Sequence, residues 1–450
     1  MFENEPSRWD QLCAFTEESR LQHDVPGVVL GILHSGEIKI AGFGVTNVEH
    51  PLEVTGQTLF QVGSISKTFT GTLIMKMVEN GEIDLDATVR SYLPDFRVAD
   101  EEASEKVTIR HLLTHTSGWS GDFFLNTGPG DDAAAKYVSE MAGLEQLAPI
   151  GQVWSYNNAG FVLLGHVIEV ISGKSYQEAL REAILEPLGL RNTFFDPGDV
   201  ITYRFATGHN NGQVARPWPL PRAVYPAGGI TCTAGDLLAY ARFHMGNGLL
   251  VNGERLLEKE SLAQMQTPAA TVWKKEQWGL TWAVDDTCDD RLVSHGGGTM
   301  GQVSKLLFAP DHDFAVVVFT NSESGSQVTL EVTRRALKDF LVIEITDPEP
   351  IGASEKALAA YVGDYSRPFA DIHLCLLGGR LIGQAIIKMG FPDKDSPPPP
   401  APPPFTLGLI EEDRLMILDG PMSSSTAEII RNADGSIGWL RAGRLHKRIA

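Results

Sequence analysis

Apolar and polar positions along this chain predict a region with strands at both ends and helices between them. A helical pattern at residues 7–22 precedes two apolar-rich runs, GVVLGILH and EIKIAGFG, which are joined by Ser35-Gly36, a two-residue hairpin signal. From residue 64 to about residue 245 the apolar spacing is mostly helical. Strand-like runs then return in LTWAV, RLVSH, VSKLLFA and DFAVVVFTN, and TRRALKDFLVI predicts a closing helix.

This order of elements predicts an α/β (α+β) fold. Five strands from both ends of the region would form an antiparallel sheet flanked by helices, with a helical insertion between them in the chain. Near residue 345 the pattern changes to EITDPEPIGASEK, whose polar residues and prolines are typical of a linker. We expect a first domain at residues 1–345, a linker at 346–354, and a separate β domain of short strands at 355–450.

The predicted β domain contains a proline tract, SPPPPAPPPF, with seven prolines between Ser396 and Phe405. Proline lacks a backbone donor and restricts φ, so the tract predicts an extended loop that pairs with no strand. We expect the loop at residues 392–405 to lie at the rim of the substrate pocket. The alternative is a solvent-exposed connector, or a ligand for the aromatic groove of a partner.

Charge and composition narrow the range of partners. The formal net charge is −20 and lysines and arginines form no run, whereas nucleic acids and anionic membranes attract basic patches, so neither is an expected partner. The start of the chain lacks a leader pattern and no segment is apolar for about 20 residues, so we expect a cytoplasmic protein unless a leader has been removed. The chain has four cysteines, Cys13, Cys232, Cys288 and Cys375. They form no CxxC pair, so the sequence predicts neither a zinc site nor a disulfide framework.

Ser64 and Lys67 stand three positions apart in VGSISKTFTG, at the expected start of a helix. Residues with this spacing share a helix face, so the side chains can touch, and a deprotonated lysine there could activate the hydroxyl. Taken alone, a lysine one turn from a serine is more often an ordinary surface residue. Two further motifs bear on the choice. YxN occurs once, at Tyr156-Asn157-Asn158, and HxG ends a predicted strand at His295-Gly296-Gly297, besides a copy in the hairpin turn at residues 34–36.

The order SxxK, YxN, HxG resembles the serine β-lactamase and penicillin-recognising hydrolase superfamily. The tyrosine version resembles the class C β-lactamase branch, which includes D-aminopeptidases, D,D-carboxypeptidases and promiscuous esterases. The stretches HLLTHTSGW and PAGGITCTAGDL also resemble that branch. The resemblance covers residues from about 10 to 345, and the tail is similar to the small β-barrel, lipocalin-like modules that some members carry.

The resemblance implies catalytic roles for Ser64, Lys67 and Tyr156. A serine at a helix N-terminus directs its own N–H to where an oxyanion would form, and by the family pattern the N–H of Gly298 joins it. The helix dipole and burial both disfavour the charged form of Lys67, which makes it a usable base. Tyr156 is a second proton carrier, and which group takes the serine proton stays open. Asn158 is suited to holding Lys67 and a substrate carbonyl.

Substrate binding is also expected along the strand at His295, Gly296, Gly297 and Gly298, where glycines let a substrate backbone lie close. β-Lactamases usually have a lysine where this chain has His295, a fixed cation that attracts a substrate carboxylate. Histidine is largely neutral at pH 7 unless its pKa is raised. The histidine therefore favours D-aminopeptidase, amidase and esterase relatives over penicillin hydrolysis.

Two other groups of residues are candidate sites. His111 and His115 have metal-ligand spacing on a predicted helix, but HLLTH lacks the glutamate of the zincin pattern, so we expect no metal and no cofactor. Trp119, Phe123 and Phe124 either line a substrate cleft or simply pack.

Together the motifs predict a serine hydrolase that forms an acyl-enzyme on Ser64 and cleaves an amide or peptide bond in the manner of a D-aminopeptidase. A carboxylesterase is the first alternative, a weak β-lactamase the second, and a non-catalytic penicillin-binding-like scaffold the third. The expected partner is a small-molecule or short-peptide substrate, and a homo-oligomer is compatible with the sequence.

Overall fold

The computed structural model describes residues 7–250, 252–286, 290–420 and 422–449, so Cys288 lies outside the described residues. The chain folds into two compact units. The first contains the residues up to Ala87 together with Gly128–Ala134 and Phe161–Ile345. The second contains Thr88–Thr127, Ala135–Gly160 and Thr346–Ala450. The linker predicted at 346–354, and with it the domain boundary, stays a prediction.

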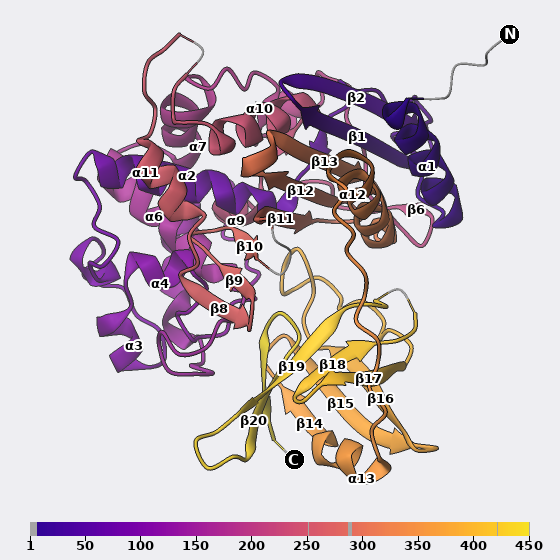
Figure 1. Ribbon diagram of the computed structural model, residues 1–450. Helices are drawn as coiled ribbons and strands as arrows, with labels where there is room; N and C mark the ends of the chain where they lie inside the picture. Colours follow the sequence, from indigo (N-terminus) through magenta and orange to yellow (C-terminus); the bar gives the residue numbers. More distant parts are fainter. Residues whose placement is uncertain (1–6, 251, 287–289, 421, 450) are drawn as a thin grey trace, which may run out of the picture. The chain divides into compact units, whose positions relative to one another are not determined.

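The first unit is built on an antiparallel sheet in the order β2-β1-β13-β12-β11-β10-β9-β8. Its long strands are β1 (Gly27–His34), β2 (Glu37–Gly44), β11 (Leu292–Gly298), β12 (Val303–Ala309) and β13 (Phe314–Thr320). In Figure 1 indigo β1 lies beside brown β13, so the two ends of this region meet in one sheet as the pattern predicts. The sheet has more strands than the predicted five, because three short ones extend it: β8 (Ala270–Trp273), β9 (Glu276–Trp278) and β10 (Ala283–Asp285).

The central strands are apolar at successive positions because helices cover both faces of the sheet. Alternate residues of β1, including Val28 and Leu30, join a core with helices α1 (Arg8–Gln22) and α12 (Gly325–Leu341). On the opposite face, Gly31 lies against Leu238 of helix α10 (Ala234–Met245). All seven residues of β13 are buried, as expected for a strand covered on both sides.

Helix α2 (Ser66–Glu79) is buried at eleven of its 14 positions, so it runs through the interior rather than along the surface. It follows directly on the 3₁₀ turn η1 (Gly63–Ile65). The other helices with residues in this unit are α6 (Ala159–Ser172), α7 (Tyr176–Leu180), α8 (Pro197–Val200), α9 (Tyr225–Gly228) and α11 (Lys259–Met265), with short turns η4 (Arg181–Leu185), η5 (Arg222–Val224) and η6 (Pro310–His312). Two small sheets join β3 (Phe60–Gln61), β7 (Thr231–Cys232) and β4 (Thr193–Phe194), and β5 (His209–Asn210) and β6 (Gln213–Val214).

The second unit contains the predicted small β-barrel, which is closed and has eight antiparallel strands. They are β14 (Gly363–Ser366), β15 (Ala370–Leu377), β16 (Arg380–Ile387), β17 (Phe405–Glu411), β18 (Arg414–Ile417), β19 (Thr426–Arg431), β20 (Ile437–Arg441) and β21 (Leu445–Arg448). Apolar side chains such as Leu381, Leu415 and Ile429 fill the interior. Closure leaves no free sheet edge, which stabilises a barrel of such short strands.

The barrel shares its unit with the segments that surround the YxN motif. These segments form α3 (Glu101–Lys106), α4 (Ile109–Leu113), α5 (Ala133–Glu140), η2 (Val89–Ser91) and η3 (Met141–Gly143), and α13 (Glu355–Leu358) and η7 (Ala359–Tyr361) precede the barrel. The indole N–H of Trp439 donates to the carbonyl of Leu147 at 2.9 Å, and the backbone N–H of Leu445 donates to the Ser155 hydroxyl at 3.2 Å. Strands β20 and β21 therefore bind the chain just ahead of Tyr156.

The loop between β16 and β17, which contains the proline tract, pairs with no strand, as the composition of the tract predicts. Ahead of the tract, the Lys394 N–H donates to the carbonyl of Phe124 at 3.0 Å, and the rings of Phe124 and Phe391 meet edge to face at 4.8 Å. Phe124 therefore packs against the base of this loop. A position of the loop at the pocket rim stays a prediction. Within the described parts of the chain, no helix has both the length and the apolar character to cross a bilayer.

Candidate active site

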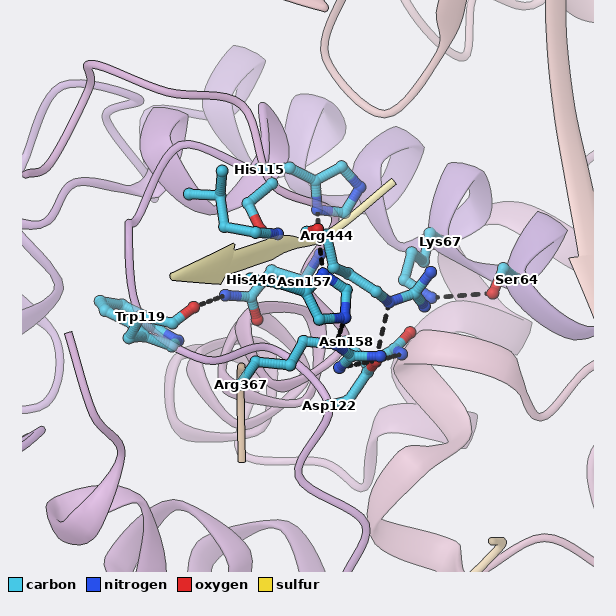
Figure 2. Close-up of polar contacts among 12 residues, drawn as sticks. Ser64, Lys67, His115, Trp119, Asp122, Asn157, Asn158, Arg367, Arg444 and His446 are labelled. Carbon is cyan, nitrogen blue, oxygen red and sulfur yellow. Dashed lines mark hydrogen bonds and ion pairs between the residues drawn. The ribbon is translucent and has the colours of Figure 1, made fainter. Parts of the chain in front are cut away.

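Ser64 and Lys67 meet at the junction of η1 and α2 in the first unit. Lys67 Nζ donates to Ser64 Oγ at 3.1 Å and to the carbonyl oxygen of Ala227 at 2.6 Å (Figure 2 draws the bond to Ser64). The Lys67 side chain is fully buried, so it is not the solvated surface lysine of the alternative interpretation. Its Nζ also lies 5.5 Å from the ring centre of Phe161.

The segment Pro226–Ile230 holds this amine in place through hydrogen bonds to successive turns of α2. The Ser66 hydroxyl accepts from the Ile230 N–H at 3.0 Å, and the Thr70 hydroxyl donates to the Pro226 carbonyl at 2.7 Å. Lys67 adds its own bond to Ala227 between them. The sequence indicated PAGGITCTAGDL only as a resemblance; the structure shows that its first residues supply an acceptor to the buried lysine.

The glycines of β11 lie directly against η1. A Cβ built on Gly297 would come within 1.9 Å of the Val62 carbonyl oxygen, and one built on Gly63 within 2.7 Å of the Gly298 nitrogen. Gly63 also has φ +52°, in the left-handed region that glycine adopts at little cost. Only glycine fits at these contacts, and the close approach brings the backbone nitrogen of Gly298 beside the turn that carries Ser64. Gly296 has more room, because a Cβ built on it would meet the Ser304 carbonyl oxygen only at 3.7 Å.

His295 is buried on the same strand and neutral. Its Nδ1 lies 2.6 Å from the carbonyl oxygen of Gly296, and its ring meets Trp278 edge to face at 5.6 Å. Burial, followed by the charge of Lys67, lowers the pKa of His295 to about 3. A neutral imidazole whose Nδ1–H donates to the Gly296 carbonyl satisfies this geometry. Position 295 therefore carries no fixed cation at neutral pH.

The low pKa of His295 makes stability depend on pH. An unfolded histidine binds a proton below about pH 6.5, whereas folded His295 stays neutral down to about pH 3, so stability must fall as the pH drops through this window. Between pH 6.5 and 5 this residue should reduce the free energy of unfolding by about 2 kcal/mol. We expect the free energy of unfolding, measured in urea at pH 7 and at pH 5, to fall by this additional amount in the wild type but not in His295→Gln. His50→Gln, at an exposed histidine, should behave as the wild type; equal losses in all three proteins would contradict the prediction.

The YxN motif lies in the second unit. The backbone N–H of Tyr156 donates to the Gly443 carbonyl at 3.0 Å, and its ring packs on His115 with 4.3 Å between centres. The guanidinium carbon of Arg444 lies 4.8 Å from the centre of the Tyr156 ring. Asn158 donates through Nδ2 to Asp122 Oδ1 at 2.8 Å (Figure 2). Tyr156 and Asn158 thus have well-defined local surroundings, and their joint action with Ser64 and Lys67 stays a prediction from the order of the motifs.

The remaining candidates have structural partners. The Asn157 side chain accepts from the Gly160 N–H at 2.8 Å and so caps α6, while His115 Nδ1 accepts from the Asn157 N–H at 3.0 Å. His111 Nδ1 lies 3.0 Å from the Thr108 hydroxyl at the start of α4. The part of the chain that the structure describes holds no cluster of three or more potential metal ligands. Trp119 is buried and packs, which favours the packing interpretation for this residue.

One cluster beside the motif was missed by sequence reasoning. Asp122 Oδ2 accepts from Arg367 Nη1 and from Arg444 Nε, each at 2.7 Å. The two arginines come from the barrel, 245 or more residues after Asp122 in the chain. No local pattern could indicate this pairing, because isolated acidic and basic residues in loops are typical of solvated surface.

The comparisons with known proteins agree with this fold and these motifs. The family model described as "Beta-lactamase" matches residues 10–339. Penicillin-binding protein 4 of Amycolatopsis lactamdurans is 33% identical over 366 residues, which covers 77% of this chain and 95% of that protein. The chain therefore belongs to the beta-lactamase family, and the predicted resemblance to serine β-lactamases and penicillin-binding proteins is confirmed.

Solved structures also match nearly the full length of the chain, barrel included. SurE matches with a TM-score of 0.74 and 24% identity, over 98% of this chain and 99% of the SurE chain. This match shows a similar fold. The octameric penicillin-binding protein homologue from Pyrococcus abyssi has a TM-score of 0.66 and 26% identity, also over 98% of this chain and 99% of that chain.

Proposed function

We propose that this protein is a serine hydrolase that cleaves an amide or peptide bond through an acyl-enzyme on Ser64. The observation that carries the proposal is the contact of 3.1 Å between Ser64 Oγ and the buried amine of Lys67. A serine becomes a nucleophile when an adjacent base removes its proton, and a buried lysine next to the hydroxyl supplies such a base. Membership of the beta-lactamase family supports the same reaction class.

The proposed reaction uses the groups around Ser64 in two steps. As Ser64 Oγ attacks the substrate carbonyl, its proton passes to Lys67, and the backbone N–H groups of Ser64 and Gly298 donate to the developing oxyanion. The leaving amine takes up this proton from Lys67 as the acyl-enzyme forms, which leaves Lys67 neutral again. Water then attacks the ester, gives its proton to the same base and releases the acid, so Ser64 recovers its hydroxyl. The close approach of Gly298 to the Ser64 turn supports the oxyanion role.

Tyr156 and Asn158 complete the proposed site. Tyr156 would share the proton with Lys67 as a second acid–base group, and Asn158 would hold the lysine and the substrate amide. The neutral state of His295 supports the choice of an amide or peptide substrate of the D-aminopeptidase type, since no fixed cation at this position selects a substrate carboxylate. A carboxylesterase uses the same chemistry and is the second candidate.

A hydrolysis panel tests the assignment. We expect D-amino acid p-nitroanilides to be cleaved faster than the L-forms, short acyl p-nitrophenyl esters to be cleaved as well, and nitrocefin slowly or not at all. Faster turnover of the esters than of every anilide would favour the carboxylesterase. No turnover of any substrate, together with stable acylation by a β-lactam, would favour the penicillin-binding-like scaffold. The octameric homologue supports a homo-oligomer in solution, which light scattering would measure.

His295→Lys should shift the preference between substrates. A lysine would place a fixed cation on β11, and a Coulomb gain on the order of 1 kcal/mol corresponds to a several-fold better kcat/KM for substrates with a carboxylate, relative to neutral ones. The measurement is the ratio of kcat/KM for matched anionic and neutral substrates. His295→Gln, which stays neutral, is the control and should leave the ratio unchanged. An unchanged ratio in His295→Lys would place the carboxylate subsite elsewhere.

A further inference from the structure

The carboxylate of Asp122 is enclosed by side chains of the barrel. Arg367 lies in the turn between β14 and β15, Arg444 in the turn between β20 and β21, and each donates to Asp122 Oδ2 at 2.7 Å. Only 4% of the Asp122 side chain and 9% of the Arg367 side chain are exposed, so solvent does little to screen this pair. Figure 2 shows the two guanidinium groups converging on one carboxylate.

His446, on strand β21, also belongs to this cluster, and its hydrogen bonds determine which of its ring nitrogens carries the proton. Arg367 Nε donates to His446 Nε2 at 3.0 Å, so that ring nitrogen must be unprotonated. Its Nδ1–H then donates to the Arg444 carbonyl at 3.1 Å. Burial and the charge of Arg367 lower the pKa of His446 to about 3, which agrees with a neutral ring. The histidine thus orients Arg367 through one nitrogen and the Arg444 backbone through the other.

The arginines keep Asp122 ionised, and the ionised carboxylate orients Asn158. Burial alone would raise the pKa of Asp122, but the charges of Arg444 and Arg367 outweigh it and hold the pKa at about 2. An ionised carboxylate only accepts hydrogen bonds, so Asn158 must turn its NH₂ toward it, as the contact of 2.8 Å between Nδ2 and Oδ1 shows. The planar amide then points its own oxygen away from Asp122, as an acceptor for another group.

The same β20–β21 turn also holds Tyr156. The Gly443 carbonyl accepts its backbone N–H at 3.0 Å, and the Arg444 guanidinium lies over its ring at 4.8 Å. Both predicted functional residues of the YxN motif are therefore in contact with residues that the barrel contributes, directly or through Asp122.

We propose that Asp122, Arg367 and Arg444 are positioning residues of the hydrolase site, through which the C-terminal barrel sets the orientation of Asn158 and Tyr156. The effect on catalysis rests on the proposed function, whereas the orientation of Asn158 does not. Replacing a whole buried ion pair by apolar groups of similar volume is often tolerated, whereas removing one charged partner lowers stability because it leaves the other charge less compensated. A purely structural cluster would therefore change stability without changing the Asn158 amide or the balance between kcat and KM.

The test uses the full-length chain with Arg444→Met, Arg367→Met, Asp122→Asn and Arg444→Lys. Arg431→Met is the control with the same substitution, because Arg431 is an exposed arginine of the barrel that pairs with Asp413, with N–O distances of 2.7 Å, and lies outside the Asp122 cluster. We expect Arg444→Met and Asp122→Asn to lower kcat about 100-fold, the loss typical of a misplaced catalytic group, with a smaller change in KM. Arg444→Lys should recover part of the loss because it keeps the charge beside Asp122, and Arg431→Met should match the wild type.

An NMR measurement separates this proposal from the proposed function. With ¹⁵N-asparagine labelling, the side-chain NH₂ signal of Asn158, assigned by its loss in Asn158→Ala, reports its bond to the carboxylate. The signal should move in Arg444→Met, Arg367→Met and Asp122→Asn and stay in place in Arg431→Met. If the wild type hydrolyses nothing in the panel, the proposed function fails while this signal still decides the positioning claim. An unchanged signal in the first three variants, or a lower melting temperature with unchanged kcat, overturns the proposal.

Discussion

Ser64→Ala should abolish turnover of every substrate, with a loss on the order of 10⁶-fold in kcat, as is typical when a serine nucleophile is removed. The substitution removes only Oγ, the atom that accepts from Lys67 Nζ at 3.1 Å. An acyl-enzyme cannot form without that oxygen. Labelling by a fluorophosphonate or a slow β-lactam, followed as a mass increase of the intact protein, should therefore disappear together with turnover.

The control for this experiment is an exposed serine. Ser139 lies on α5, where its hydroxyl donates to the Lys136 carbonyl at 2.7 Å. Ser139→Ala should keep both labelling and turnover at the level of the wild type. If Ser64→Ala retained turnover with any substrate, the nucleophile assignment would be wrong, whatever the family of the chain. If it lost turnover but was still labelled, the label would mark another residue.

Lys67→Met should lower kcat/KM by roughly 10²–10⁴-fold, the usual contribution of a positioned acid–base group. Methionine fills a similar volume in the buried site but cannot hydrogen-bond to Ser64 Oγ or to the Ala227 carbonyl. Because burial of an amine is costly and methionine is apolar, we expect the fold to tolerate the change. Fluorophosphonate labelling of Ser64 should become slow without vanishing, since the oxygen is still present.

Lys76→Met is the matched control, because Lys76 lies in the last turn of the same helix and the substitution is the same. Its turnover and labelling rate should equal those of the wild type. The measurements are kcat/KM for the best panel substrate and the labelling rate across pH 5 to 10. Full activity in Lys67→Met would exclude the lysine as the base and leave Tyr156 as the candidate.

The local parts of this site could be predicted from the sequence. Ser64 and Lys67 meet because residues three apart in a helix share a face whatever the rest of the chain does. The apolar runs that became β1 and β13 are readable because each strand is covered on both faces and so is apolar at successive positions. The cap by Asn157 depends likewise on a residue three positions away.

Other features depended on segments far apart in the chain. Lys67 finds its second acceptor at Ala227, 160 residues later, and no periodicity connects the two. From the sequence, Gly297 is expected to let a substrate backbone lie close, and the Val62 carbonyl at 1.9 Å from a built Cβ shows that close packing within the fold requires a glycine there as well. Strands β8 and β9, which extend the sheet, pair over too few residues to leave a periodic signal, whereas β10 overlaps the strand-like run LTWAV.

The amino-acid order was thus sufficient for the family motifs, the long strands of the sheet and the contact between Ser64 and Lys67, since these follow from local geometry and apolar spacing. The protonation of His295 and the ionisation of Asp122 were not accessible in this way, because a pKa depends on burial and on charges brought in from elsewhere in the fold. Arg367 and Arg444 look like ordinary surface residues until folding removes water from around Asp122 and brings them together. The ion pairs of this cluster therefore form only when the protein has folded.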